Sequence, residues 1–249
     1  EHENNISLNE ELFARIKAVY KQQDKETLSP EQHKLLEDIY NGFVRNGANL
    51  LGEDKEKYRA LCKELSLLTL QFSENNLKET NDYKLVITDK SQLAGLPESA
   101  VEAAAETAGE KGVEGWVFTL QAPSYGPFLT YADSRDLRRE LYMAYNTKCT
   151  HDNASNNLEI VKKLANVRME IAQLLGYDNF AEYNLQERMA QNSESVYKLL
   201  DQLLEAYTPT AKQEYAEVQA LARQAEGEDF VLMPWDWACL LYTSPSPRD

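Results

Sequence analysis

The sequence predicts a mainly α-helical fold with one small two-stranded β element. Ten glycines and eight prolines in 249 residues leave few turns, which favours long helices over a many-stranded sandwich or barrel. Apolar residues recur at three- and four-residue steps along most of the chain, which is the spacing of one helical face. A hydrophobic fraction of 43% is enough to bury a sizeable core.

The first part of the chain predicts three helices. One starts near Ser7, with Ser7 or Asn9 as its cap, and carries an apolar stripe as far as Tyr20. The segment 29–32 (Ser-Pro-Glu-Gln) has the composition of a capping box with proline at the first helical position, so the second helix begins there. The third and longest predicted helix runs from Glu53 to about Thr80.

The middle of the chain predicts the β element. The segments 83–88 and 116–120 are short, rich in β-branched and aromatic residues, and bounded by Asp, Gly or Pro. We expect the two strands to pair with each other. Between them, Pro97 opens an alanine-rich helix over Ser99–Ala108, which has high helix propensity but little volume to bury. Gly109 and Gly112 are expected to end it.

Helices resume after the β element. Their expected ranges are 134–145, 157–174 with a left-handed cap at Gly176, 180–189, 192–207 and 211–224. Pro209 is expected to break or kink the chain between the last two. No apolar stretch approaches the roughly 20 residues of a membrane span, so no membrane partner is expected.

Charge and cysteine content limit the kinds of partner. There are 41 acidic and 26 basic side chains, which gives a formal net charge of −15. This balance argues against nucleic acid as a partner, because phosphate binding needs clustered Lys and Arg. Three scattered cysteines are too few for a disulfide framework, and no segment reads as a secretory signal. We therefore expect a reducing compartment.

No catalytic or metal-binding centre is evident in these residues. The three histidines, His2, His33 and His151, are far apart in sequence and none lies in H-E-x-x-H, so no zinc site is expected in this chain. Cys149 and His151 could act as a nucleophile and its base, but the segment 149–152 reads better as the ragged end of a helix. Cys62 is expected to be a small buried residue.

The last eleven residues differ in character from the rest. Cys239 to Asp249 resembles the in-frame translation of a transposon-end adapter used in tagmentation libraries, and all eleven codons agree. The chain also begins without methionine. We expect residues 239–249 to be a non-native tail and the rest to be an internal piece of a longer protein.

Several segments together resemble the thimet oligopeptidase and peptidyl-dipeptidase family of zinc metallopeptidases. The segment 174–183 (LLGYDNFAEY) is similar to the family's LLGY-x-x-[YF]-A-x-[YW] segment. Further similar segments are 119–125 with 132–135 and 138–141, which match a strand, a loop and an Arg-rich helix, and 234–237 (PWDW). The segments 8–19 and 43–50 are closest to the bacterial peptidyl-dipeptidase branch. The resemblance covers Ile6 to Ala238.

The resemblance implies a cytoplasmic zinc peptidase in which two mainly helical lobes of zincin type enclose a channel for short peptides. Residues 1–238 would be part of the helical lobe and form a channel wall. The family's zinc ligands and its general base lie on H-E-x-x-H and a later Glu, with supporting Tyr and His residues further on. No catalytic or metal-binding position of the family falls on a residue of this chain, and substrate-binding residues are unassigned.

The resemblance therefore predicts zinc in the parent enzyme, none in this piece, no activity of the piece alone, and the catalytic lobe as its natural packing partner. The alternative is a complete, non-catalytic, acidic helical module that binds peptides or a partner protein.

Overall fold

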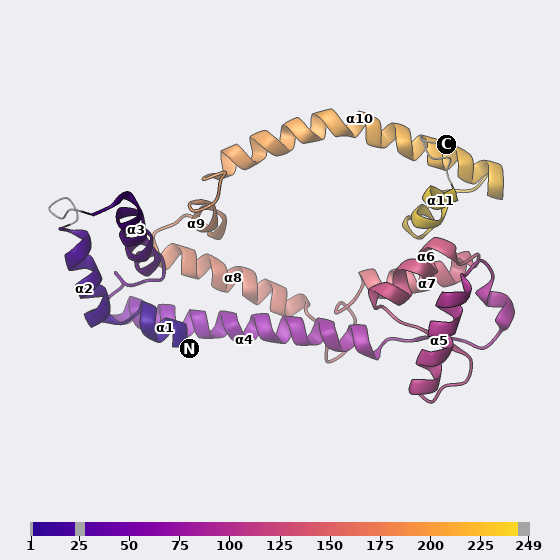
Figure 1. The fold of residues 1–249 in the computed structure, drawn as a ribbon, viewed down its shortest axis with the longest axis horizontal. Helices are drawn as coiled ribbons and strands as arrows, with labels where there is room; N and C mark the ends of the chain where they lie inside the picture. Colours follow the sequence, from indigo (N-terminus) through magenta and orange to yellow (C-terminus); the bar gives the residue numbers. More distant parts are fainter. Residues whose placement is uncertain (1, 23–27, 244–249) are drawn as a thin grey trace. The chain divides into compact units, whose positions relative to one another are not determined.

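The structure, a computed structural model, describes residues 2–22 and 28–243, and within them the chain is mainly helical (Figure 1). Two compact units make up the chain. The first comprises Glu1–Gln71 and Glu159–Val196, and the second comprises Phe72–Leu158 and Tyr197–Asp249. Helices α4 and α10 each contribute residues to both units. None of the described helices combines the length and apolarity needed to cross a bilayer.

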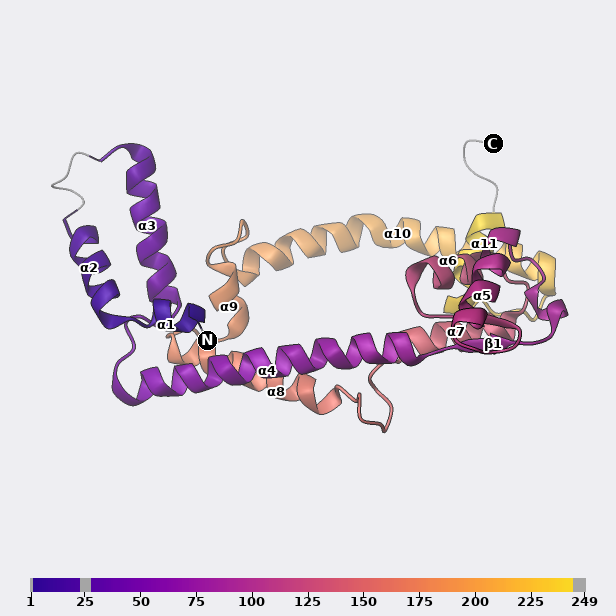
Figure 2. The same cartoon turned by 60° about the horizontal axis from the view of Figure 1, so that its bottom comes forward.

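The regular elements of the first unit are all helices in the residues that the structure describes. Its elements are α1 (His2–Ser7), α2 (Glu10–Tyr20), α3 (Pro30–Arg45), the first part of α4 (Gly52–Asp82), α8 (Leu158–Leu174) and α9 (Phe180–Leu185). The apolar faces of α4 and α8 meet in one cluster that includes Leu61, Leu68, Ile160 and Leu164. The two helices lie side by side in both views (Figures 1 and 2). This core is the one that the helical spacing predicts.

The predicted helix ends of the first unit are confirmed. The Asn9 side chain accepts the Leu12 N–H at 2.9 Å, so Asn9 is the N-cap of α2. Ser29 and Gln32 form the reciprocal bonds of a capping box at the start of α3. Gly176 adopts a φ of +86°, and the Tyr177 N–H donates to the Ala172 carbonyl at 2.9 Å, which is the pattern of a Schellman cap.

The second unit combines helices with the two-stranded sheet. Its elements are the end of α4, β1 (Leu85–Ile87), the 3₁₀ turn η2 (Lys90–Leu93), α5 (Glu98–Glu110), β2 (Trp116–Phe118), α6 (Ala122–Tyr131), α7 (Arg135–Asn146), most of α10 (Ser193–Glu226), the 3₁₀ turn η3 (Pro234–Asp236) and α11 (Trp237–Thr243). Strands β1 and β2 pair antiparallel, with Val86 opposite Val117. The predicted pairing is confirmed, although each strand is shorter than expected.

The core of the second unit lies between the sheet and the helices that pack on it. Ile87, Phe118, Phe128 and Leu141 are among its fully buried side chains and come from β1, β2, α6 and α7. The Phe118 and Phe128 rings pack edge to face with centroids 4.6 Å apart. Helix α5 packs on β2, and α6 packs on α5, α7 and β2.

Gly115, immediately before β2, allows the two strands to approach. Its φ is +101°, and a Cβ atom there would lie 2.2 Å from the Ile87 carbonyl oxygen. Only glycine adopts this conformation and leaves room for this contact without strain.

The predicted break at Pro209 does not occur, because α10 continues through it from Ser193 to Glu226. The alternative, a kink at Pro209, stays a prediction. Proline removes one N–H from the helical ladder, and the carbonyl it leaves unpaired belongs to Glu205. Residues 205–207 and Pro209 are exposed, so water can pair with that carbonyl. The cost of the proline is therefore too small to end the helix.

Three other helices differ from the sequence prediction. Helix α6 occupies a segment that was expected to be a loop. It was not predicted because the segment contains two prolines and one glycine, which are typical of turns. Pro123 lies in the first turn, where its missing N–H costs nothing. Helix α1 was also not predicted, and α9 ends at Leu185 instead of Met189, where i to i−3 bonds such as Arg188 N–H to the Leu185 carbonyl replace the helical pattern.

Candidate functional site

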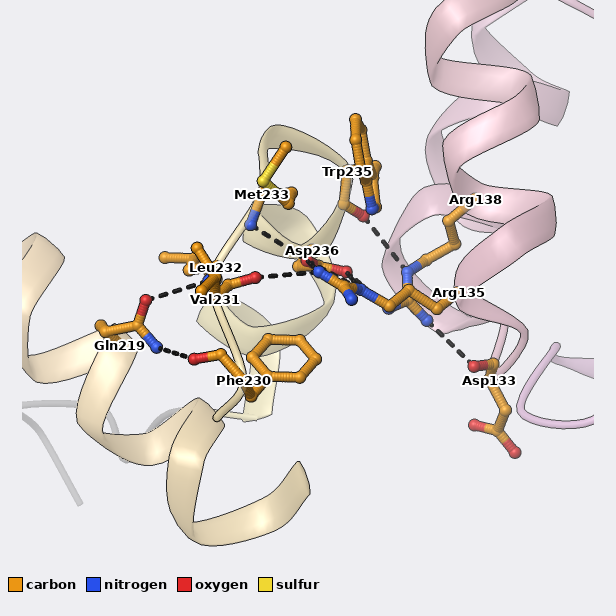
Figure 3. A network of polar contacts seen from close by, with 10 residues as sticks. All are labelled: Asp133, Arg135, Arg138, Gln219, Phe230, Val231, Leu232, Met233, Trp235 and Asp236. Atoms are coloured by element: carbon orange, nitrogen blue, oxygen red, sulfur yellow. Dashed lines mark hydrogen bonds and ion pairs between the residues drawn. The ribbon is translucent and has the colours of Figure 1, made fainter. Parts of the chain in front are cut away.

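In the second unit, a buried carboxylate is held by two arginines (Figure 3). Asp236, in the Trp-Asp-Trp segment, is fully buried, and Arg135 and Arg138 reach it from the first turn of α7. Arg135 donates from Nε at 3.0 Å and from Nη2 at 2.7 Å, and Arg138 donates from Nη2 at 3.1 Å. The Met233 N–H adds a bond of 3.0 Å. We call Arg135, Arg138 and Asp236 the arginine clamp.

Other guanidinium N–H groups of the clamp bind backbone carbonyls. Arg138 donates to the carbonyls of Ala132 at 2.7 Å and Trp235 at 3.2 Å, and Arg135 donates to that of Val231 at 2.9 Å. These bonds satisfy charged groups that would otherwise be costly to bury. The clamp therefore fixes the 231–236 segment against α7.

Gln219 of α10 holds the same segment from its other side. Its Nε2 donates to the Phe230 carbonyl at 2.9 Å, and its Oε1 accepts the Leu232 N–H at 2.9 Å (Figure 3). Both halves of the amide are thus used in a two-point contact with the backbone. The segment between α10 and α11 is consequently bound by side chains of two helices.

The clamp has the electrostatics of a permanent ion pair. Burial disfavours the charged form of Asp236, but hydrogen bonds from Arg135, the Met233 N–H and Arg138 outweigh it and hold the pKa of Asp236 below its usual range. A carboxylate with so many donors keeps no basic lone pair for a substrate proton. The clamp therefore positions the Trp-Asp-Trp segment and does not itself perform acid–base chemistry.

The sequence singled out these residues only as family-like segments. Arg135 and Arg138 lie three positions apart on α7, so they share a face, but their partner is about 100 residues away. No local spacing predicts that pairing. The one local indication was the position of Asp236 between two tryptophans, because a charged residue among apolar neighbours needs a partner if it is buried.

Cys149 is not a nucleophile poised by His151. Cys149 is 4% exposed, and burial together with the neighbouring Glu79 carboxylate raises the pKa of Cys149 to about 11. The Cys149 N–H donates to the Glu79 carboxylate, and Cys149 has a φ of +59° in the turn after α7. His151 is exposed, and its Nε2 lies 3.2 Å from the Thr147 hydroxyl. This segment is a turn held by Glu79, not the end of a helix.

The donor set for zinc is not assembled in the described residues. His2 lies in α1, His33 is half-buried in α3, and His151 lies in the turn after α7. Across residues 2–22 and 28–243 there is no group of three or more His, Cys, Asp or Glu side chains placed to hold a metal ion. The residues present do not fit a zinc centre.

Cys62 packs beside the core of the first unit, as predicted, and is half-buried. Burial raises the pKa of its thiol, which is consistent with a packing role.

The end of the described chain packs on α6. Helix α11 contacts α6, and the Tyr242 ring meets the Tyr131 ring at a centroid distance of 4.9 Å. Leu241 and Tyr242 remain exposed, and Trp235 and Trp237 are half-buried. Residues 244–249 lie outside the described part. The non-native origin of residues 239–249 stays a prediction.

Comparison with known proteins identifies the class of protein to which this chain belongs. The sequence profile of Peptidase family M3 matches residues 128–244, a range that includes the end of α6, all of α7 and α10, and the arginine clamp. This chain belongs to peptidase family M3, the family of thimet oligopeptidases and peptidyl-dipeptidases, whose members are zinc metallopeptidases.

Individual relatives agree with that assignment. The chain is 36% identical to oligopeptidase A of Escherichia coli K12 over 216 residues, which are 85% of this chain and 32% of the relative. It is 34% identical to dipeptidyl carboxypeptidase of the same strain over 236 residues, 94% of this chain and 34% of the relative. It is 33% identical to a probable cytosolic oligopeptidase A of Arabidopsis thaliana over 233 residues, 90% of this chain and 33% of the relative.

The chain thus spans about a third of the length of the curated relatives it matches. Oligopeptidase A and dipeptidyl carboxypeptidase match at similar identity, so closeness to the peptidyl-dipeptidase branch stays a prediction.

Proposed function

We propose that this chain is part of a zinc metallopeptidase that hydrolyses short peptides, and that it supplies helical scaffold beside the substrate channel. The observation that carries the proposal is the similarity of 82–94% of the chain to oligopeptidase A and dipeptidyl carboxypeptidase, at 34–36% identity. The relative named as cytosolic supports a cytoplasmic location for the parent enzyme.

In this proposal the zinc centre lies outside the 249 residues. The sequence contains no H-E-x-x-H, and the described side chains do not fit a metal. When bound, zinc would activate the attacking water in the parent enzyme. The role of this chain is to hold the Trp-Asp-Trp segment in place through the arginine clamp, and to present its helices to the channel.

An apolar stripe on α10 supports a packing partner. Tyr197, Leu200, Leu204 and Tyr207 recur at three- and four-residue steps, and all four are at least 50% exposed. A contiguous apolar stripe on a helix marks an interaction surface more often than a solvated face. We assign this stripe to contact with the remaining two-thirds of the M3 chain, which includes the catalytic lobe.

Sequencing the source DNA across codons 238 and 239 tests the proposal. Longer reads are expected to continue from Trp-Asp-Trp towards H-E-x-x-H. Genomic sequence that continues through Cys-Leu-Leu-Tyr to a stop codon would overturn it.

Variants of the complete M3 chain test the packing surface. The pair Leu200→Lys with Leu204→Lys is expected to lower its peptidase activity and its melting temperature, because two charges would be buried. Gln202→Lys is the matched control, because it adds a charge on the other side of α10 and is expected to change neither. Equal behaviour of the pair and the control would contradict the assignment.

The exposed apolar stripe on α10 also supports the second candidate function, a non-catalytic binding module. A non-catalytic acidic helical module could bind peptides or a protein through an exposed apolar surface without any metal. A purified 1–238 chain that is monomeric, unfolds cooperatively and binds peptides would favour this module. Aggregation without a defined melting transition would favour a piece that lacks its partner lobe.

A further inference from the structure

Residues 177–191 of the first unit lie between α8 and α10 and are only loosely packed. None of these residues is fully buried. The core cluster of the unit includes side chains as far as Leu175 and none from this segment. The segment contains α9, whose six residues make too short a helix to be stable in water without tertiary contacts. Because apolar burial contributes little here, the polar contacts of the segment decide whether it stays in place.

Arg45, in the last turn of α3, holds this segment through its guanidinium group. Its Nη2 donates to the Tyr183 carbonyl at 2.9 Å, and its Nη1 donates to Gln186 Oε1 at 2.9 Å. Its Nε lies 2.9 Å from Oε1 of Glu187. The guanidinium also lies over the Tyr183 ring, 4.4 Å from the centroid, and the Tyr183 hydroxyl donates to the Arg45 carbonyl at 3.4 Å. All three guanidinium nitrogens and one face of the group therefore contact the segment.

Two of the segments that resemble the peptidase family meet at this contact. Arg45 belongs to 43–50, and Tyr183 belongs to 174–183. A hydrogen bond from a charged donor is roughly twice as strong as a neutral one. A planar guanidinium can make several such bonds while it stacks on a ring, which a lysine ammonium cannot do. The attachment of the segment is thus concentrated in one side chain that is only 13% exposed.

The backbone at both ends of the segment is suited to a hinge. Gly176, just before it, has a φ of +86°, and Gln191, at its end, has a φ of +62°. Glycine adopts such values freely, whereas a residue with a side chain does so at a cost. A change of backbone conformation at Gln191 would release that strain.

We propose that residues 177–191 form a strap that opens as a unit, and that Arg45 is the latch that holds the strap closed. The strap opens at a lower free energy than the rest of the first unit, because its opening breaks the Arg45 contacts and leaves the α4 and α8 core intact. The inference goes beyond the proposed function, because this motion requires neither zinc nor peptide hydrolysis.

Two contacts show what an open strap would release. The Tyr183 hydroxyl lies close enough to the half-buried Cys62 thiol for their charges to interact, so opening makes Cys62 more accessible. The Ser193 hydroxyl donates to the Glu182 carboxylate, so opening also frees the first turn of α10. The strap therefore links the surface around Cys62 to the start of α10.

Hydrogen exchange of the 249-residue chain, followed by mass spectrometry, tests the latch. In Arg45→Gln the amides of α9 are expected to exchange at least about tenfold faster, because charge-assisted hydrogen bonds are lost. The amides of α8 are expected to keep their rates. Arg45→Lys should resemble Arg45→Gln, since lysine keeps the charge but not the planar fork.

Two further variants separate opening of the strap from unfolding. Glu187→Gln removes a partner that is 56% exposed, so it should accelerate exchange of α9 less than Arg45→Gln and leave the unit folded. Arg59→Gln is the matched control, because Arg59 lies on α4 in the same unit and contacts Glu56 and Asn5 outside the strap. It is expected to leave the exchange of α9 unchanged.

Alkylation of Cys62 by iodoacetamide gives an independent readout. Arg45→Gln is expected to raise its rate about tenfold, in proportion to the open population of the strap. Cys149, which lies in the other unit, is the internal reference, and its rate should not change. Peptide mapping by mass spectrometry measures both thiols in one sample.

Three results would overturn the proposal. The first is unchanged exchange of α9 in Arg45→Gln. The second is an equal acceleration of α9 and α8 in both Arg45→Gln and Glu187→Gln, which would mean that the strap opens only when the unit unfolds. The third is an equal effect of Arg45→Gln and Arg59→Gln on α9 and on Cys62. Full protection of α9 in Arg45→Lys would contradict the role of the planar guanidinium.

Discussion

The two units of the chain hold their cores together in different ways. In the first unit, apolar side chains of α4 and α8 such as Leu68 and Leu164 meet along two helical stripes. In the second unit, the core gathers side chains from a sheet and several helices, and a buried ion cluster lies beside α7. The first arrangement follows from local helical spacing, and the second depends on contacts between distant parts of the sequence.

The difference between the two units indicates which substitutions should destabilise this chain most. Truncation of one apolar side chain in a stripe leaves a cavity but no uncompensated charge, and the surrounding side chains can partly relax into the space. A buried charge whose partner is removed has no substitute. Substitutions in the clamp should therefore have larger effects than single truncations in the first unit.

Removal of the Asp236 charge is expected to have the largest effect. Asp236→Asn keeps the shape of the side chain but leaves Arg138 buried without its counter-ion, which should cost about 3–5 kcal/mol in the free energy of unfolding. Denaturant unfolding of the 249-residue chain measures it. Asp229→Asn, in the exposed loop before the clamp, is the control. Similar losses for the two variants would mean that the clamp does not stabilise the unit.

Truncation of Phe128 tests the helix that the sequence did not predict. Phe128 is fully buried between α6 and β2, so Phe128→Ala should cost about 3–5 kcal/mol. Phe72→Ala, at a partly exposed position of α4, should cost less. The two unfolding midpoints give the comparison, and a neutral Phe128→Ala would place α6 outside the core.

Substitution of Gly115 should have a smaller but definite effect. Gly115→Ala places a Cβ against the Ile87 carbonyl at positive φ and should cost about 1–3 kcal/mol. Gly109→Ala is a matched control within α5, where nothing lies within 4 Å, and should be neutral or stabilising by about 0.5–1 kcal/mol. Thermal unfolding distinguishes the pair, and the opposite order would contradict the described turn.

The smallest of the expected effects concerns the rate at which the Cys149 thiol is alkylated. Its pKa is raised to about 11, so the thiolate is scarce at pH 8 and alkylation by iodoacetamide should be slow in the folded chain. The rate should rise as the pH approaches 11, and unfolding in urea should remove the protection. Peptide mapping by mass spectrometry assigns the rate to Cys149. Rapid alkylation of the folded chain at pH 8 would contradict the buried turn.

The sequence predicted the long helices and their caps, because these depend on residues within one or two turns of each other. It predicted the two strands because each is a short run of β-branched and aromatic residues bounded by turn residues, although the strands that pair are about 30 positions apart. It did not predict α6, whose prolines and glycine conceal a helix that is stabilised by burial of Phe128. It also predicted a break or a kink at Pro209, and the break does not occur because solvent lowers the cost of the lost hydrogen bond. The arginine clamp could not be predicted from local spacing, because Asp236 and Arg135 are 101 positions apart in the sequence.

We propose that this chain is part of a metallopeptidase and that it supplies scaffold and not the catalytic centre. The most direct test is cleavage of a fluorogenic short peptide by the 249-residue chain with and without Zn²⁺, with zinc content measured on the same sample. We predict no turnover and no stoichiometric zinc. Zinc-dependent turnover by this chain alone would contradict the account.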